Sequence, residues 1–103
     1  MRKLIQPIKF DWDDGNLNKN YEKHNVTTQE AENIFSNEPI TIGEDKAHSN
    51  HEERYGALGR TQNGRKLSVV FALRNNKVRI ISARDMSRKE RITYEAAEKD
   101  STI

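Results

Sequence analysis

The architecture of this chain is set by residues 54–84, which read RYGALGRTQNGRKLSVVFALRNNKVRIISAR. Apolar and polar side chains alternate along three runs, which are separated by Asn63-Gly64 and Asn75-Asn76. Asparagine and glycine tolerate the positive φ angles that two-residue hairpin turns require. The stretch therefore predicts three consecutive antiparallel strands, near residues 53–61, 66–74 and 77–84.

Two-residue turns would fix the register of these strands, because Gln62 then pairs with Arg65 and Arg74 with Lys77. One face is expected to form the core, and it carries the rows Leu58, Val69, Ser82 and Gly56, Phe71, Ile80, with Leu73 and Val78 beyond. On this face Arg60 and Arg84 are expected to lie on either side of Leu67, about 10 Å apart. The opposite face is expected to be shallow and apolar and to accept a partner protein; it carries Tyr55, Ala57, Val70, Ala72, Arg79, Ile81 and Ala83.

Helical patterns lie on both sides of this stretch. Residues 16–24 predict a first helix, with Leu17, Tyr21 and His24 on one face, Asp14 as N-cap and Asn25 as a left-handed stop. Two pairs have capping-box spacing: Thr27 with Glu30, which opens a second helix, and Ser87 with Glu90, which opens a last helix over about 88–98. Alternation in residues 8–12 and 40–42 adds an extended entry and a short strand.

The expected fold is therefore α+β: a small single domain over residues 1–103, with two N-terminal helices, an antiparallel sheet of about four strands and a C-terminal helix. A chain of 103 residues fits one hydrophobic core. The absence of cysteine excludes disulfides and thiolate chemistry and favours a reducing, cytoplasmic location. The sequence has no apolar stretch of the roughly 20 residues that span a bilayer, so no membrane association is expected.

Charge is distributed unevenly. Residues 1–54 hold seven Lys/Arg against eleven Asp/Glu, whereas residues 55–103 hold eleven against five. Between Tyr55 and Arg84 there are seven basic residues and no acidic one. Such a run attracts phosphate groups, although a solvated basic face without a ligand explains the charge equally well.

The segment that follows the third strand concentrates arginine: Arg84, Arg88 and Arg91 lie within eight residues and lead into a helix N-terminus. The planar guanidinium matches phosphate oxygens, and free helix amides also favour an anion. Glu90 and Tyr94 are one helical turn apart and are candidates for proton transfer and for contact with the phosphate or a base. A capping role for Glu90 and a core position for Tyr94 are the competing interpretations.

Histidines give weaker signals. His24 follows Lys23 at a helix end and is a candidate acid or phosphate ligand, but a structural histidine fits there too. His48 and His51 lie among acidic residues, yet without cysteine or a recurrent zinc spacing they are more simply surface residues. We expect no metal ion and no cofactor.

Four segments together resemble one known family, the BrnT toxins. They are residues 10–13 (FDWD), 20–31 (NYEKHNVTTQEA), 52–61 (EERYGALGRT), and 80–84 with 88–95 (IISAR and RKERITYE). The chain departs from the usual BrnT pattern at Gly15-Asn16, Asn25 and Thr28.

The resemblance implies a ribonuclease toxin of a type II toxin–antitoxin system, with a RelE-like fold, that inhibits translation. It implies catalytic residues Arg84, Arg88, Glu90 and Tyr94, with Arg60, Lys23 and His24 in the binding surface; Arg91 joins that surface from the arginine cluster. It also implies a BrnA-like antitoxin, bound in a hetero-oligomer, through which alone the toxin reaches operator DNA.

We expect RNA cleavage by attack of the neighbouring 2′-hydroxyl, which leaves a cyclic phosphate. This reaction is expected to need no metal ion, because side chains can transfer the protons and stabilise the pentavalent phosphate. Two alternatives stay open: a non-catalytic nucleic-acid-binding module, and a degenerate toxin kept for operon autoregulation.

Overall fold

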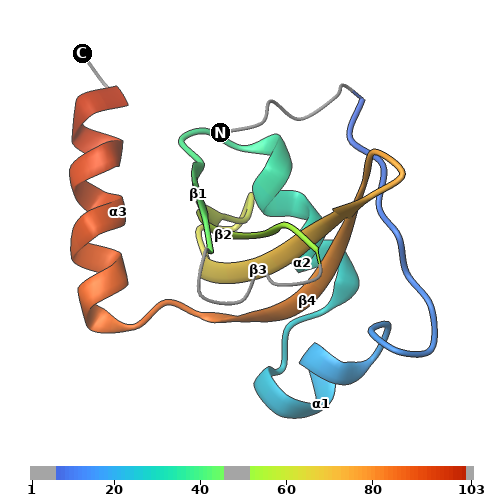
Figure 1. Ribbon diagram of the computed structural model, residues 1–103. Helices are drawn as coiled ribbons and strands as arrows, with labels where there is room; N and C mark the ends of the chain where they lie inside the picture. Colours follow the sequence, from blue (N-terminus) through green and yellow to red (C-terminus); the bar gives the residue numbers. More distant parts are fainter. Residues whose placement is uncertain (1–6, 46–51, 102–103) are drawn as a thin grey trace.

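The computed structural model describes residues 7–45 and 52–101. A four-stranded antiparallel sheet has the order β1-β2-β3-β4, formed by Thr41–Glu44, Arg54–Arg60, Lys66–Arg74 and Lys77–Asp85. Helices α1 (Lys19–His24) and α2 (Thr28–Asn33), followed by the 3-10 turn η1 (Ile34–Ser36), precede the sheet. Helix α3 (Arg88–Ser101) follows β4 and stands at the opposite side of the molecule from α1 (Figure 1). The α+β class, the strand order and the helix positions are confirmed.

The first hairpin turn is longer than predicted. Thr61 N donates to Arg65 O at 2.9 Å and Gly64 N donates to Thr61 O at 2.9 Å, so the loop holds three residues. Of its residues only Gly64 has a positive φ, of 88°, whereas the type I′ two-residue turn needs a positive φ at both Asn63 and Gly64. β2 therefore pairs with β3 one residue out of the predicted register, with Arg60 opposite Lys66.

The second hairpin turn has the predicted two residues, Asn75 and Asn76, with φ of 52° and 64°. Arg74 pairs with Lys77, and the predicted pairing continues to Phe71 with Ile80. Beyond that point a bulge at Ile81 shifts the register, so that Ser68 lies opposite Arg84.

These two shifts move several residues to the other face. Leu58, Gly56 and Ser82 lie on the face opposite to the core, contrary to prediction, while Leu67 stays in the core. Arg60 and Arg84 still share one face, because each shift displaces its own strand by one residue. Leu67 does not lie between them, however; Lys66 and Ser68 do. We call this second face, which carries Leu58, Lys66, Ser68 and Arg84, the open face.

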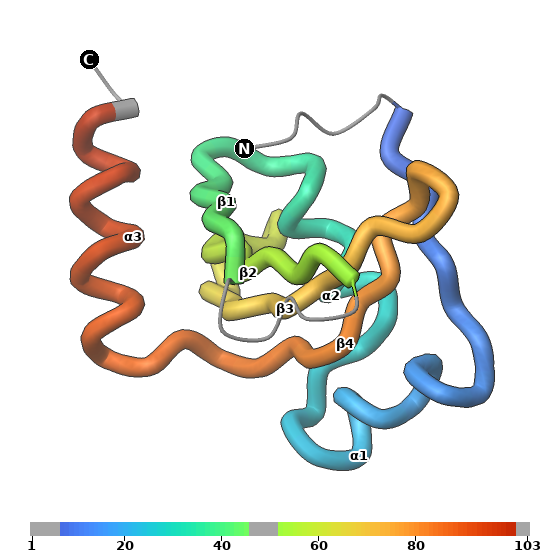
Figure 2. Tube along the Cα trace, in the orientation of Figure 1, coloured from blue at the N-terminus to red at the C-terminus, as the bar shows by residue number. Residues whose placement is uncertain are grey.

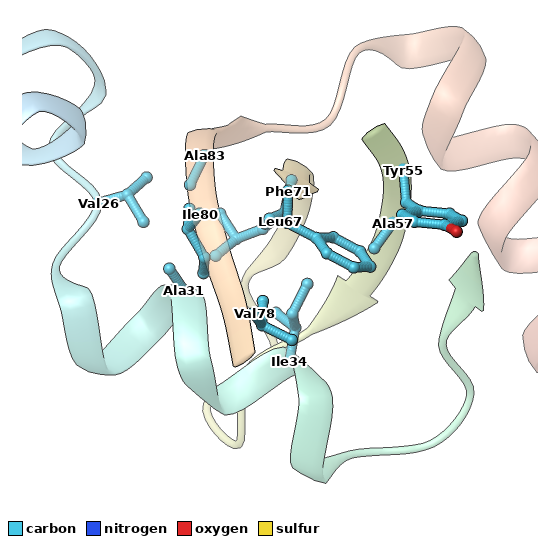
Figure 3. Close-up of a cluster of buried hydrophobic side chains, with 11 residues drawn as sticks. Val26, Ala31, Ile34, Tyr55, Ala57, Leu67, Phe71, Val78, Ile80 and Ala83 are labelled. Atoms are coloured by element: carbon cyan, nitrogen blue, oxygen red, sulfur yellow. The ribbon is translucent and has the colours of Figure 1, made fainter. Parts of the chain in front are cut away.

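The core lies between the sheet and the N-terminal helices (Figure 3). It contains Ala31 and Ile34 from α2 and η1 and, from the strands, Tyr55, Ala57, Leu67, Val69, Phe71, Val78, Ile80 and Ala83. Phe71 is packed between Phe35 and Tyr55, with ring centroids 5.3 and 5.5 Å away. The shallow docking face predicted around Tyr55, Ala57 and Ala83 is therefore wrong, since these side chains are at most 4% exposed and belong to the core.

Helix α1 is shorter than predicted. It begins at Lys19 rather than Asn16, because Asp13 Oδ1 accepts the Gly15 amide at 2.8 Å and holds residues 13–17 in a turn. Leu17 and Tyr21 are 41% and 56% exposed, so the predicted apolar face is not the one that packs. The C-terminal stop at Asn25 is confirmed by its φ of 56°. At the other end of the chain, α3 extends to Ser101 instead of ending near residue 98.

Two buried asparagines of this region complete the outer edge of β4. Asn16 Nδ2 donates to Ile80 O at 3.0 Å, and Asn20 Oδ1 accepts from Ala83 N at 3.0 Å, on either side of the bulge. The N-terminal segment continues the edge, where Asp11 N donates to Val78 O at 2.8 Å; Figure 2 shows this segment beside the β3–β4 hairpin. The edge is thereby covered, which protects it from pairing with other chains.

Asn20→Ala is expected to destabilise the fold by about 1–3 kcal/mol, because it leaves the buried Ala83 amide without an acceptor. Asn18→Ala is the matched control: Asn18 is exposed and its side chain makes no capping hydrogen bond. Urea unfolding of both variants measures the difference. Equal free energies of unfolding would contradict the role given to Asn20.

Candidate active site

The end of β4 and the start of α3 bring Arg84 and Glu90 together. Arg84 Nη1 donates to Glu90 Oε1 at 2.7 Å and Nη2 donates to Oε2 at 3.0 Å, in a two-pronged pair. Ser68 Oγ donates to the same carboxylate at 3.2 Å from the neighbouring strand. The Arg84 side chain remains 42% exposed, so it is accessible to an anion from solvent.

Glu90 also closes a capping box at the start of α3. Its Oε1 accepts the Ser87 amide at 2.8 Å, while Ser87 Oγ accepts the Glu90 amide at 3.2 Å. The hydrogen bonds from Arg84 first, and that from Ser87 next, lower the pKa of Glu90 to about 2 against the opposing effect of burial. Glu90 is therefore ionised at neutral pH and acts as an acceptor. Its capping contacts, one of the two predicted interpretations, are present in the structure.

The Arg84–Glu90 pair makes stability depend on acid pH. Because the pKa of Glu90 is about 2 in the fold and 4.5 ordinarily, its contribution is complete above pH 4.5 and is lost as the pH falls toward 2. We expect wild type to be more stable than Glu90→Gln at pH 6, and the difference to shrink between pH 4.5 and 2. Urea midpoints across this range test it; a difference that does not vary with pH would contradict the pairing.

Helix α3 carries two further carboxylates toward the open face. Lys66 Nζ lies 2.8 Å from Glu95 and 3.5 Å from Glu98, and Arg60 Nη1 lies 3.6 Å from Glu98. Arg60 also donates to Glu38 O at 2.9 Å. Glu90 and Glu98 are about 12 Å apart along the helix axis, so Arg84 and Arg60 lie at opposite ends of the same basic surface.

Tyr94 holds α3 against the rest of the fold. Its ring is fully buried, and its hydroxyl donates to Pro39 O at 2.6 Å. Burial, followed by the charge of Glu98, raises the pKa of this hydroxyl. Arg88 and Arg91, by contrast, are exposed on α3 near Arg84 in sequence. The predicted catalytic set is thus the accessible Arg84 paired with Glu90, the exposed Arg88, and a tyrosine engaged in an internal contact. Arg91, predicted to bind RNA, is exposed as well.

A groove of about 600 Å³ crosses the open face beside this pair. Arg84, Glu90 and Ser68 line one end, and its floor includes Gly43, Gly56 and Val70. A concave surface with an accessible guanidinium at its edge can hold an extended anionic ligand.

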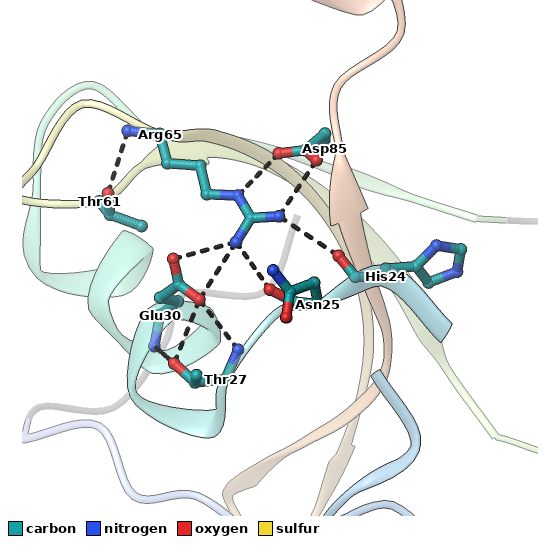
Figure 4. Close-up of polar contacts among 7 residues, drawn as sticks. All are labelled: His24, Asn25, Thr27, Glu30, Thr61, Arg65 and Asp85. Carbon is teal, nitrogen blue, oxygen red and sulfur yellow. Dashed lines mark hydrogen bonds and ion pairs between the residues drawn. The ribbon is translucent and has the colours of Figure 1, made fainter. Parts of the chain in front are cut away.

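Lys23 and His24 lie elsewhere, at the end of α1, which packs along the outer edge of β4. Arg65 links the end of α1 to the end of β4 (Figure 4). Its guanidinium donates to Asp85 Oδ1 at 2.7 Å, to Glu30 Oε2 at 3.0 Å, and to the carbonyl oxygens of Asn25 and His24. The imidazole of His24 points away from this cluster in Figure 4. The cluster joins both N-terminal helices to the end of β4, next to Arg84.

Sequence reasoning missed Arg65, Lys66 and Ser68. It counted Arg65 and Lys66 only as members of a basic run, and it gave Ser68 no role. The partners of these side chains are 20 to 41 residues away in sequence, so no local spacing marks them. The only available signal was the strand register. Lys66 and Ser68 lie on the non-core face, as their alternation with Leu67 predicts, but the three-residue turn and the bulge bring Arg60 and Arg84 onto that face beside them.

The described residues contain neither a metal-binding cluster nor a membrane-spanning helix. Within residues 7–45 and 52–101 no group of three or more histidine or acidic side chains is arranged to hold a metal ion. His48 and His51 lie outside the described residues. No helix in the same ranges has the length and apolar character needed to cross a bilayer.

Comparison with known proteins gives one family. The family model described as "Ribonuclease toxin, BrnT, of type II toxin-antitoxin system" matches residues 12–90, which include β1 to β4 and the start of α3 up to Glu90. No curated protein matches the chain.

Proposed function

The chain belongs to the BrnT family of ribonuclease toxins of type II toxin–antitoxin systems, and from this we propose that it cleaves RNA at the Arg84 end of the groove without a metal ion. Cleavage inhibits translation, and a cognate antitoxin neutralises it. The observation that carries the proposal is the exposed Arg84 guanidinium, held by Glu90 beside a groove on the open face.

Cleavage proceeds by attack of a 2′-hydroxyl oxygen on the adjacent phosphorus. A new P–O bond forms, the bond from phosphorus to the 5′-oxygen breaks, the 2′-proton passes to an acceptor, and the leaving oxygen takes a proton. Arg84 binds the phosphate oxygens, and the neighbouring Arg88 adds positive charge as the pentavalent state develops. The products are a 2′,3′-cyclic phosphate and a 5′-hydroxyl.

The low pKa of Glu90 determines which catalytic roles we assign to its carboxylate and to the arginines. A carboxylate with a pKa of about 2 is a weak base, so it accepts a hydrogen bond from the 2′-hydroxyl more readily than it removes the proton. Most of the acceleration is therefore assigned to electrostatic stabilisation by arginine. Tyr94 acts through the position of α3, because its hydroxyl is bonded to Pro39 O.

RNA extends from this site over basic residues on both sides. Arg60 lies on the same open face about two helical turns of α3 away, and Arg91 is exposed on α3 itself. Lys23 and His24 approach the end of β4 from α1, since Arg65 joins the His24 carbonyl to Asp85. These four residues bind phosphates along the RNA and contribute affinity rather than chemistry.

The partner that follows from the family is an antitoxin. We propose a BrnA-like protein that forms a hetero-oligomer with the toxin in the cytoplasm and carries the DNA-binding part, so that the toxin reaches operator DNA only through it. Covering the groove and Arg84 is sufficient to exclude RNA.

A second function is favoured by one observation. Glu90 is already paired with Arg84, and that arrangement suits a protein that binds RNA, or is retained for operon autoregulation, without cutting it. Alanine at Glu90 or at Tyr94 discriminates between the functions. Loss of cleavage with RNA affinity kept supports the enzyme, whereas wild type that binds RNA and never cuts it supports the non-catalytic module.

Metal independence has a direct test. We expect the cleavage rate of a single-stranded RNA to be unchanged in excess chelator, because arginine supplies the charge that a metal ion would supply. Loss of activity in chelator, with recovery on addition of a divalent ion, would overturn this mechanism. Substituting His48 and His51 would then be the next experiment.

A further inference from the structure

Three of the five glycines have a structural reason to be glycine. Gly64 has a φ of +88° in the first hairpin turn. A Cβ on Gly59 would lie 2.9 Å from Ile34 Cβ, within the core. A Cβ on Gly15 would lie 3.1 and 3.2 Å from the paired side chains of Asp13 and Arg79. At Gly64 and Gly59 the fold disfavours a larger residue, and at Gly15 a larger residue requires the Asp13–Arg79 pair to shift.

Gly43 and Gly56 have no such reason. They face each other directly across β1 and β2, in a stretch where the pairing is continuous and contains no bulge. A Cβ built on either would meet no atom of residues 7–45 and 52–101 within 4 Å, and neither has a positive φ. Glycine weakens a strand, and where no bulge or bend requires it, it often marks a place where a ligand approaches the backbone closely.

The empty space above this glycine pair is the groove that ends at Arg84. On the open face the glycine pair has the Thr41–Leu58 pair on one side. Val70 lies beside Gly56 on the neighbouring strand β3. Ser68, also on β3, lies between this floor and the Arg84–Glu90 pair. Small and apolar residues thus surround the glycine pair, and the Arg84 guanidinium stands at one end of the groove, which Glu44 and Asp45 also line beyond Gly43. A flat aromatic ring joined to a phosphate has the complementary shape and charge.

We propose that the glycine pair forms the floor of a subsite for one nucleobase of the RNA, which lies flat on Gly43 and Gly56 while its phosphate binds Arg84. This rests on the proposed function, since it names the part of the substrate that the groove receives. Leu58 and Val70 flank the ring, and the absent Cβ atoms allow it to reach the peptide planes. Affinity at this site therefore depends on the base as well as on phosphate charge.

The test uses Gly56→Val and a graded pair, Gly43→Ala and Gly43→Val, in the full chain. Two probes of equal length are compared: an all-2′-O-methyl RNA oligonucleotide, which cannot undergo 2′-hydroxyl attack, and its abasic counterpart. Wild type is expected to bind the oligonucleotide with bases about 5- to 100-fold more tightly than the abasic one, which is the range of stacking one base. Gly56→Val is expected to bind both equally, with the abasic affinity unchanged, and Gly43→Ala to fall between.

Ala96→Val, on an exposed position of α3, is the control and should bind both probes as wild type does. The glycine variants should keep their thermal midpoint or raise it, because a Cβ at these positions meets no atom of the described residues and valine suits a strand. Folded Gly56→Val that still prefers the probe with bases would overturn the subsite. Equal affinity of wild type for both probes would overturn it too and leave the ribonuclease proposal standing, whereas failure of wild type to bind or cleave RNA would contradict that proposal itself.

Discussion

Arg84→Ala is expected to slow RNA cleavage by about 10²–10³-fold, the loss typical of removing one preorganised donor to a developing negative charge. Glu90 orients the Arg84 guanidinium at the edge of the groove, and among the described residues that line the groove Arg84 is the one basic residue. Arg88 adds charge from outside this lining, so it does not replace the two donors of Arg84. Arg84→Lys should recover part of the rate, because lysine restores the charge without the planar pair of donors. Initial rates on a defined single-stranded RNA give the measurement.

Arg74→Ala is the matched control for this loss. Arg74 is an exposed arginine that pairs with Glu52 at 2.9 Å beside the β3–β4 turn, and it does not line the groove. Its loss should change the rate by less than about threefold. If Arg84→Ala stays folded and cuts RNA within threefold of wild type, the assignment of the phosphate site to Arg84 is wrong.

Phe71→Ala is expected to cost about 3–5 kcal/mol of unfolding free energy. Phe71 is 1% exposed and lies at the centre of an aromatic row that runs from Phe10 through Phe35 to Tyr55. Its removal leaves a cavity between the sheet and η1 that backbone pairing on both sides keeps from collapsing. A domain of this size is typically stable by only about 5–15 kcal/mol, so the variant loses a large part of its stability.

Leu17→Ala is the control for this second prediction, because Leu17 is also a large apolar residue but is 41% exposed. It should cost less than about 1 kcal/mol. Chemical unfolding of both variants measures the two free energies. A cost for Phe71→Ala as small as that for Leu17→Ala would show that the core is not organised around the aromatic row.

Elements whose signals are local could be predicted from the sequence. Both capping boxes, the left-handed stop at Asn25 and the two-residue turn at Asn75-Asn76 depend on contacts within four residues, and all are present. The order of the three long strands followed from those turns. The start of α1 was misplaced because the side chain of Asp13 competes for the Gly15 amide, an interaction that helix periodicity does not report.

The strand register was harder to predict, because one extra residue in a turn or in a strand shifts every pair beyond it. The choice between two and three residues in the first turn depends on the φ of Asn63, and the bulge at Ile81 depends on Asn16 and Asn20 from another element. The relation of Arg60 to Arg84 was predicted correctly only because the two shifts compensate. Arg65 and Lys66 found their partners through the tertiary fold, so the sequence assigned them charge but no position.

The most direct test of the central claim is to incubate the purified chain with a single-stranded RNA and to identify the ends of the products. The account predicts an upstream fragment with a 2′,3′-cyclic phosphate and a downstream fragment with a 5′-hydroxyl, formed by wild type and lost with Arg84→Ala. Intact RNA after incubation with a stoichiometric amount of folded wild type, or fragments that carry a 5′-phosphate, would contradict it.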